Sequence, residues 1–126
     1  MLEVSSNGIV TVNRGDSFTL GFRINRGSSF LPDYYELQPG DFLYFALMEP
    51  RQRFEEAAVR KAFTNADQGT DGVVSMAFEP RDTECLAPGK YYYTLKLRRL
   101  VGYDDDKNEL YEVETIRSKT QFTIID

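Results

Sequence analysis

Alternation of apolar and polar side chains is the feature that most limits how this chain can fold. In one early stretch every second residue is apolar, namely Phe18, Leu20, Phe22 and Ile24. The same alternation returns at residues 91–98, where apolar side chains again occupy the odd positions. Successive side chains of a strand point to opposite faces, so a period of two predicts a strand with one buried face. Both stretches therefore predict a sheet protein.

Shorter segments predict further strands, separated by clusters of Gly, Pro, Asn and Asp. Residues 9–12, 74–78 and 121–125 are short apolar or alternating runs. Residues 34–37 suggest a short edge strand inside a long connection. Residues 42–48 are apolar on both faces, which predicts a central strand that this chain or a partner covers on both sides.

Two segments carry weaker signals. Residues 54–64 fit either a helical turn or an edge strand with its charges, Arg60 and Lys61, facing outward. We favour the strand because every neighbouring segment is predicted to be a strand. Residues 82–86 suggest one helical turn with Asp82 as its cap.

The strand at 91–100 and a returning strand at 110–117 predict a hairpin around the polar loop 104–108. In this hairpin we expect the basic side chains Lys96 and Arg98 to face the acidic side chains Glu112 and Glu114. Opposite charges on directly paired residues stabilise a ladder. The sequence therefore predicts ion pairs along the hairpin.

About eight short strands with regular turns and no long helix are typical of an all-β protein, folded as a two-layer antiparallel β-sandwich. The chain has 126 residues, a length that suits a single domain. We therefore expect one sandwich domain that spans residues 1–126.

Composition restricts the chemistry that the chain can perform. Histidine is absent and Cys85 is the single cysteine, so Ser-His-Asp and Cys-His catalysis are excluded and the usual zinc sites are disfavoured. We expect Cys85 to be a small buried apolar residue. The sequence assigns no catalytic, metal-binding or cofactor-binding residue and leaves the binding residues unknown, so we expect no cofactor and no enzymatic activity.

The net charge of −5 disfavours nucleic acid as a partner, because phosphate contacts require clustered Lys and Arg. No apolar run is long enough to predict a membrane span. The first residues lack the basic and apolar regions of a secretion signal. We therefore expect synthesis in a reducing cytoplasm.

Residues 14–17 spell Arg-Gly-Asp-Ser, a tetrapeptide that some matrix proteins use to bind integrins. Here the motif follows the predicted strand 9–12 and precedes the strand that begins at Phe18. Gly and Asp supply turn geometry between strands. We therefore interpret the motif as a turn and not as a ligand for cell attachment.

Residues 86–91 (LAPGKY) resemble the tyrosine corner of immunoglobulin-like sandwiches, in which a Leu, a Pro-Gly turn and an inward Tyr follow each other. A wider resemblance joins residues 82–83 and 86–93 to residues 14–20, 40–45, 72–74 and 120–125. The order of these segments is similar to that in the N-terminal immunoglobulin-like domain of upper baseplate proteins of tailed bacteriophages that infect Gram-positive bacteria.

That resemblance implies a non-enzymatic virion structural protein, in the tail or baseplate or associated with the head. It would be made in the bacterial host cytoplasm and would act as an assembly and docking module. The implied partners are other virion subunits, with copies of this chain forming a homo-oligomer, and neither nucleic acid nor a membrane.

An alternative function is a carbohydrate- or receptor-binding sandwich, with a host glycan as ligand. Exposed aromatic rings can stack on sugars, and the tyrosines considered for this role are Tyr34, Tyr35, Tyr44, Tyr92, Tyr103 and Tyr111. Sugar-binding platforms favour Trp, which is absent, and Tyr is common in half-buried strands. The docking module is therefore the preferred hypothesis.

Two acidic patterns resemble functional sites only in part. Asp104, Asp106 and Asn108 match the start of an EF-hand calcium loop, but Glu109 stands where Gly is required and Thr115 where the final Glu is required. The pairs 55–56 and 112/114 are acidic, yet no feature marks two carboxylates as buried and opposed across a cleft. We interpret the first pattern as a solvated hairpin loop and the second as solvated faces.

Overall fold

The computed structural model describes residues 2–126, and this part of the chain is all-β, with only three single-turn 3-10 segments. These segments are η1 (Phe54–Glu56), η2 (Asn65–Asp67) and η3 (Pro80–Asp82). The eight strands of the described part are β1 (Leu2–Val4), β2 (Val10–Asn13), β3 (Phe18–Arg23), β4 (Phe42–Met48), β5 (Val59–Phe63), β6 (Val73–Phe78), β7 (Gly89–Tyr103) and β8 (Glu109–Ile125).

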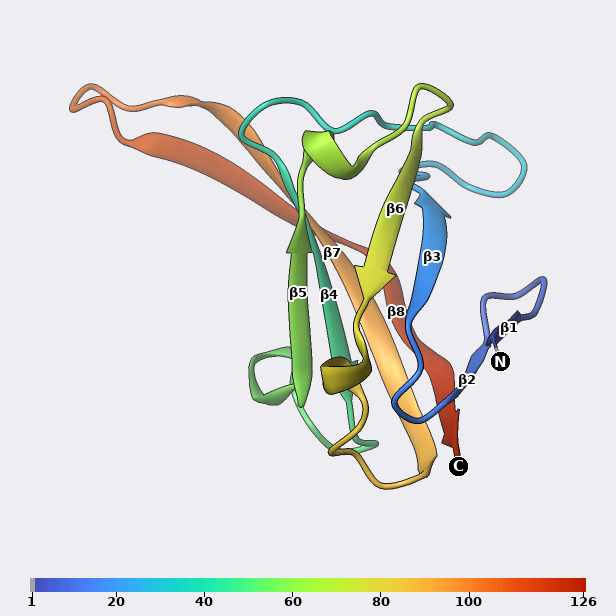
Figure 1. The fold of residues 1–126 in the computed structure, drawn as a ribbon. Coiled ribbons are helices and arrows are strands. Elements are labelled where there is room, and N and C mark those ends of the chain that lie inside the picture. Colours follow the sequence, from blue (N-terminus) through green and yellow to red (C-terminus); the bar gives the residue numbers. More distant parts are fainter. Residues whose placement is uncertain (1) are drawn as a thin grey trace.

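The strands form one large curled sheet and one small sheet (Figure 1). The large sheet has the order β1-β2-β8-β7-β4-β5, and the small sheet consists of β3 and β6. The prediction of a purely antiparallel fold is wrong at one place, because β2 and β8 run parallel, with Val10 opposite Phe122. These strands lie far apart in sequence, so no tight turn forces them to run in opposite directions.

The core lies between the two sheets and is rich in aromatic rings. Phe45 from the large sheet meets Phe78 from the small sheet edge to face, with 5.0 Å between ring centroids. Phe78 also stacks on Phe18 at 4.7 Å. The alternating residues of β3, β6 and β7 all supply buried side chains to this core, which confirms the period-two prediction for these strands.

The segment 86–91 forms a corner that leads into β7. The Tyr91 hydroxyl donates a 2.7 Å hydrogen bond to the Ala87 carbonyl, and the Tyr91 side chain is buried. Gly89 has a φ of 153°, which L-residues with a Cβ rarely adopt. The predicted inward Tyr after a Pro-Gly turn is therefore confirmed.

The predicted central strand 42–48 is confirmed as β4, which pairs with β7 on one side and β5 on the other. Ala46 and Met48 are also buried, so this chain itself covers both faces of the strand at these positions. The favoured strand at 54–64 is confirmed only for β5, whereas Phe54–Glu56 form the alternative, a helical turn. Lys61 does not face outward as predicted. Its Nζ donates to the Ala77 carbonyl at 2.9 Å and pairs with Asp82 at 2.8 Å.

Three other local predictions are wrong. The edge strand expected at 34–37 is reduced to a single bridge between Asn25 and Tyr34. Asp82 ends the turn η3 instead of capping a later one, and its carboxylate accepts the Glu79 amide proton at 2.8 Å. Cys85 is exposed and not buried. The turn that follows η3 buries Thr83 instead.

The expected ion pairs of the hairpin are also wrong in register. Lys96 lies opposite Thr115 and Arg98 lies opposite Val113, so neither basic residue faces a glutamate. The hairpin contains irregular positions near Tyr93–Lys96 and Leu100–Gly102. A shift of one residue moves every side chain to the other face of a strand, and here Arg99 becomes the residue that faces Glu112.

Candidate docking surface on the β7–β8 arm

The outer part of the β7–β8 hairpin leaves the sheet as a two-stranded ribbon, which we call the arm (residues 99–114). The pairing of β7 with β4 ends where Phe42 meets Arg98. The pairing of β8 with β2 covers only Phe122–Ile125. Beyond these points the two strands pair only with each other among the described residues. Figure 1 shows the arm, in orange and red, extending well past the body of the molecule.

Ion pairs brace one face of the arm where it meets the body. Arg26, from the long connection after β3, forms an ion pair with Glu114, and Arg99 pairs with Glu112 at 3.3 Å. Both guanidinium groups also lie over the Tyr35 ring, at 5.5 Å and 5.3 Å from its centroid. Glu112 and Glu114, interpreted from the sequence as a solvated acidic face, therefore both bind arginine.

A buried carboxylate fixes the same junction. Asp41 is 2% exposed, and its two oxygens accept the Leu100 amide proton at 3.0 Å and the Gln38 amide proton at 2.9 Å. The Tyr35 hydroxyl also donates to Asp41. Burial raises the pKa of Tyr35, and the hydrogen bond to Asp41 raises it further. A buried charge requires such partners, so Asp41 ties the long connection to the first arm residues.

The opposite face of the arm root is held by a stacked arginine. The Arg98 guanidinium carbon lies 3.5 Å from the Tyr111 ring centroid, and Arg98 Nη1 donates to the Tyr44 hydroxyl at 3.2 Å. A cation over an aromatic face is attracted by the ring quadrupole. Contacts on both faces therefore set the direction in which the arm leaves the body.

The hairpin loop uses the residues that resemble a calcium motif for its own hydrogen bonds. The Asp104 carboxylate accepts the Asp106 and Asn108 amide protons, at 2.9 Å and 2.8 Å. The hydrogen bond from the backbone amide of Asn108 is the largest of the effects that lower the pKa of Asp104. No cluster of His, Cys, Asp or Glu able to hold a metal occurs in residues 2–126. The loop therefore has the geometry of a closed hairpin turn.

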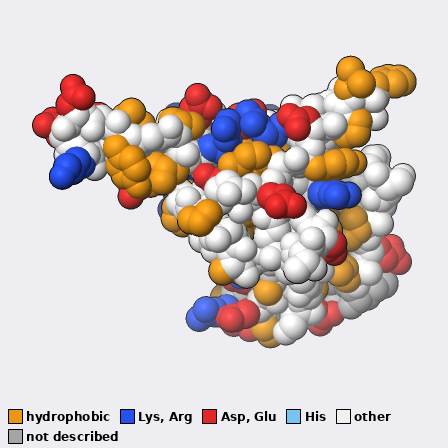
Figure 2. Space-filling view, turned by 90° about the horizontal axis from the view of Figure 1, so that it is seen from above, with side chains coloured by type: hydrophobic (Ala, Val, Ile, Leu, Met, Phe, Trp, Pro, Cys, Tyr) orange, Lys and Arg blue, Asp and Glu red, His pale blue; other side chains and the backbone are white. Residues whose placement is uncertain are grey.

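Large apolar side chains are exposed along the arm, both at its root, where Val113 lies between Glu112 and Glu114, and farther out. Tyr103 is 62% exposed and Val113 is 60% exposed, and Val101 and Leu110 are exposed as well. Figure 2 shows apolar side chains along the arm at the left and a second apolar projection at the opposite rim. Phe30, in the long connection after β3, is 93% exposed. Exposed apolar patches of this kind mark interaction sites.

The Arg-Gly-Asp-Ser segment forms a turn between the two sheets, as predicted. Gly15 has a φ of 79° and its amide donates to the buried Thr83 hydroxyl at 2.9 Å. The Asp16 amide donates to the Asn13 carbonyl at 3.2 Å, and Arg14 pairs with Asp126 at 2.7 Å. These bonds give the motif a structural role that connects β2 to β3.

The tyrosines considered for sugar stacking lie on different elements and most of their faces are occupied. Arg23 lies 4.2 Å from the Tyr34 ring, and Tyr44 stacks on Phe42 at 5.9 Å. Tyr35 and Tyr111 lie under arginines, as described above, and Tyr92 is half-buried. Tyr103 alone among the six lies on the outer arm with a largely exposed ring.

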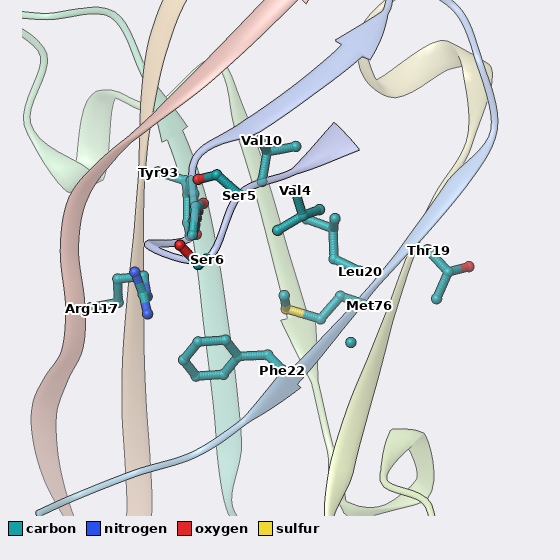
Figure 3. A pocket seen from close by; sticks show the side chains of 12 residues that line it. Val4, Ser5, Ser6, Val10, Thr19, Leu20, Phe22, Met76, Tyr93 and Arg117 are labelled. Atoms are coloured by element: carbon teal, nitrogen blue, oxygen red, sulfur yellow. Dashed lines mark hydrogen bonds between the residues drawn. The ribbon is translucent and has the colours of Figure 1, made fainter. Parts of the chain in front are cut away.

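A cleft of about 300 Å³ lies on the other side of the molecule, between the β1–β2 turn and β3 (Figure 3). Its apolar wall includes Leu20, Phe22 and Met76, and Arg117 lies at its margin. Sequence reasoning missed this cleft, because it depends on how the turn at 5–9 approaches β3. The available signal was Gly21, a bare position in the middle of an otherwise regular strand.

No helix in residues 2–126 is long and apolar enough to cross a membrane. Comparisons with family models, with curated proteins and with solved structures found no match for this chain.

Proposed function

We propose that this protein is a non-enzymatic structural component of a tailed bacteriophage particle, positioned in the tail or baseplate or associated with the head. It acts as an assembly and docking module. The observation that carries the proposal is the arm: Tyr103 and Val113 are exposed on a ribbon whose root is held on both faces. Such a ribbon has no role in closing the core, so its exposed side chains are available to a neighbour.

The mechanism in this proposal is packing and not chemistry. Burying apolar surface contributes about 25 cal/mol per Å², and the arm exposes four large apolar side chains, Val101, Tyr103, Leu110 and Val113. Binding also costs the entropy of ordering the groups that meet. The bonds of Asp41 with the Leu100 amide order the arm before it binds, which lowers this cost.

Two features support the finer assignment of the fold as an immunoglobulin-like β-sandwich. Two sheets face each other over one aromatic core, and Tyr91 forms the corner hydrogen bond that is a hallmark of that fold. The resemblance of the segment order to upper baseplate proteins extends the proposal to the virion. The partners are then neighbouring virion subunits and other copies of this chain, and synthesis takes place in the host cytoplasm.

Mass spectrometry of purified particles, grown from a genome that encodes this chain, tests the proposal. We expect the chain at a fixed stoichiometry, and we expect Val113→Asp to reduce its incorporation while Ala58→Asp, at an exposed position just before β5, leaves incorporation unchanged. Absence of the chain from particles would refute the virion role. A glycan-array signal that Tyr103→Ala abolishes would instead favour the receptor-binding alternative.

A further inference from the structure

We propose that the arm of one copy binds the cleft of a second copy, with the free edge of β8 at residues 109–114 adding to the free edge of β3. This inference rests on the proposed assembly function and names the partner of the arm. The occupant of the cleft in Figure 3 is then the arm of another copy of this chain. Addition of a strand to an exposed sheet edge is a common mode of recognition.

The acceptor is an uncovered strand edge. Within residues 2–126, β3 pairs only with β6, so its other edge has no strand beside it. Four consecutive β3 residues, 19–22, line the cleft. Neighbouring residues of a strand point to opposite faces, so the cleft runs along the backbone edge of β3 and not along one face. Natural proteins normally protect such edges.

The cleft combines apolar walls with one cation. Leu20, Phe22 and Met76 form its apolar part, and none of the described residues that line it is acidic. The Arg117 guanidinium lies 5.8 Å from the Phe22 ring centroid and donates to the Asn7 carbonyl at 3.0 Å. A volume of about 300 Å³ corresponds to roughly ten water molecules, which is room for a large side chain. An apolar segment that carries carboxylates is the complementary ligand.

The arm has that composition. Residues 101–114 hold six carboxylate side chains and one lysine, so the arm carries a net charge opposite to that of Arg117. Within the donor segment, Glu112 and Glu114 pair with arginines of the same chain and Glu109 accepts from Tyr111. Leu110 and Val113 on β8 are exposed. The β8 edge in the arm pairs with β7 alone among the described strands. Residues 109–114 also match the six-residue length of β3.

The two surfaces of one molecule cannot meet each other. Figure 1 shows the arm on one side of the body and the β1–β2 turn, which borders the cleft, on the opposite side. Each copy therefore offers one donor and one acceptor, and the contact joins different surfaces. Such head-to-tail interfaces produce rings when the rotation closes and filaments when it does not.

Sedimentation velocity of the full chain over a concentration series tests this inference. We expect wild type to form multimers. Val113→Asp places a charge on the arm, and Arg117→Glu reverses the charge in the cleft. Each substitution should weaken association about tenfold or more. Ala58→Asp is the matched control, because it places the same charge on an exposed position outside both surfaces, and it should associate like wild type. Circular dichroism melts should show that all variants are folded.

Mixing the two variants gives a sharper result. Val113→Asp keeps its acceptor and Arg117→Glu keeps its donor, so an equal mixture should form heterodimers that cannot grow further. In a Cys85→Ser background, Thr19→Cys together with Val113→Cys should give a ladder of disulfide-linked multimers after mild oxidation, whereas Val113→Cys alone should give no species beyond a dimer.

Three outcomes would overturn the inference: a monomer at every soluble concentration, multimers that Val113→Asp and Arg117→Glu leave unchanged, or a mixture that fails to form heterodimers. These results are separable from failure of the proposed function. A chain that is monomeric in solution but present in purified particles would refute arm-to-cleft pairing and keep the virion role. A chain that forms multimers in solution but is absent from purified particles would refute the virion role and keep arm-to-cleft pairing.

Discussion

The body and the arm of this protein are built from the same two strands but are stabilised differently. In the body, β7 lies between β8 and β4, and its side chains Tyr93, Leu95 and Leu97 are buried. In the arm, β8 is the one strand of residues 2–126 that lies beside β7, and Val101 and Tyr103 are exposed. The body therefore depends on apolar burial, whereas the arm depends on hydrogen bonds and ion pairs at its root.

This difference separates folding from interaction. Changes in the body should lower the free energy of unfolding, whereas changes in the outer arm should alter association and leave the free energy of unfolding nearly constant. The expected losses of stability therefore decrease from the core, through the junction, to the outer arm.

Truncation of a central ring should have the largest effect. Phe45 is fully buried and contacts the rings of Phe78, Tyr93 and Phe122. We expect Phe45→Ala to lower the free energy of unfolding by about 3–5 kcal/mol, because it removes apolar contacts and leaves a cavity. Urea denaturation measures the change. A loss below about 1 kcal/mol would mean that the core repacks freely, which contradicts a close-packed body.

Removal of the junction carboxylate should have the next largest effect. Asp41→Ala leaves the Leu100 and Gln38 amides without their acceptor, and we expect a loss of about 2 kcal/mol. Hydrogen exchange at the Leu100 amide should accelerate as the arm root loosens. Asp105→Ala, in the exposed hairpin loop, is the control and should change neither quantity. Unchanged exchange at Leu100 in Asp41→Ala would show that other contacts alone hold the arm.

The body contains an ion pair that should make its stability depend on pH. Burial acts to raise the pKa of Asp82, but the hydrogen bonds from Lys61 and the Glu79 amide outweigh this effect and lower it. A lowered folded-state pKa gives stability that is present above the unfolded pKa, about 3.9, and is lost as pH falls through the folded pKa.

We therefore expect the stability contributed by Asp82, about 1 kcal/mol, to disappear below about pH 4. Urea denaturation of wild type and Asp82→Asn at several pH values measures this contribution. The two proteins should differ at neutral pH and converge in acid. If the difference in the free energy of unfolding between the two proteins stayed constant as the pH fell below about 4, the carboxylate charge of Asp82 would not stabilise the fold.

The smallest effect on stability should come from the arm. Val113→Asp exchanges one exposed side chain for another, and we expect its free energy of unfolding to stay within about 0.5 kcal/mol of wild type. Thermal and urea denaturation at a concentration where the chain is monomeric measure this quantity. A loss comparable to that of Phe45→Ala would make the arm part of the folding core and would remove the distinction between the two regions.

The body was more predictable from the sequence than the arm because its signals are local. Alternation at Phe18–Phe22 and in residues 91–98 reports directly which side chains are buried. The hairpin around Asp104–Asn108 was also predictable, since turn residues stand between two alternating runs. These features depend on neighbouring residues and on the geometry of a single strand.

The features that sequence reasoning missed depend on distant parts of the chain. The hairpin becomes an arm because its pairing with β4 ends at Arg98. The residues of the hairpin alone do not predict where that pairing ends. Irregular pairing at Leu100–Gly102 decides which residue faces Glu112. Lys61 turns inward because its Nζ donates a hydrogen bond to Asp82, twenty-one positions later in the chain. The cleft beside β3 likewise requires the turn at 5–9, which no local pattern connects to Phe22.

Shortening the arm is the most direct test of its separation from the body. Replacing residues 101–110 with Asn-Gly joins the paired residues Leu100 and Tyr111 through a two-residue hairpin turn. We predict that this variant folds with a free energy of unfolding close to that of wild type and fails to enter purified particles in a complementation assay. A shortened chain that enters particles at the wild-type stoichiometry would contradict the central claim that the arm is the docking element.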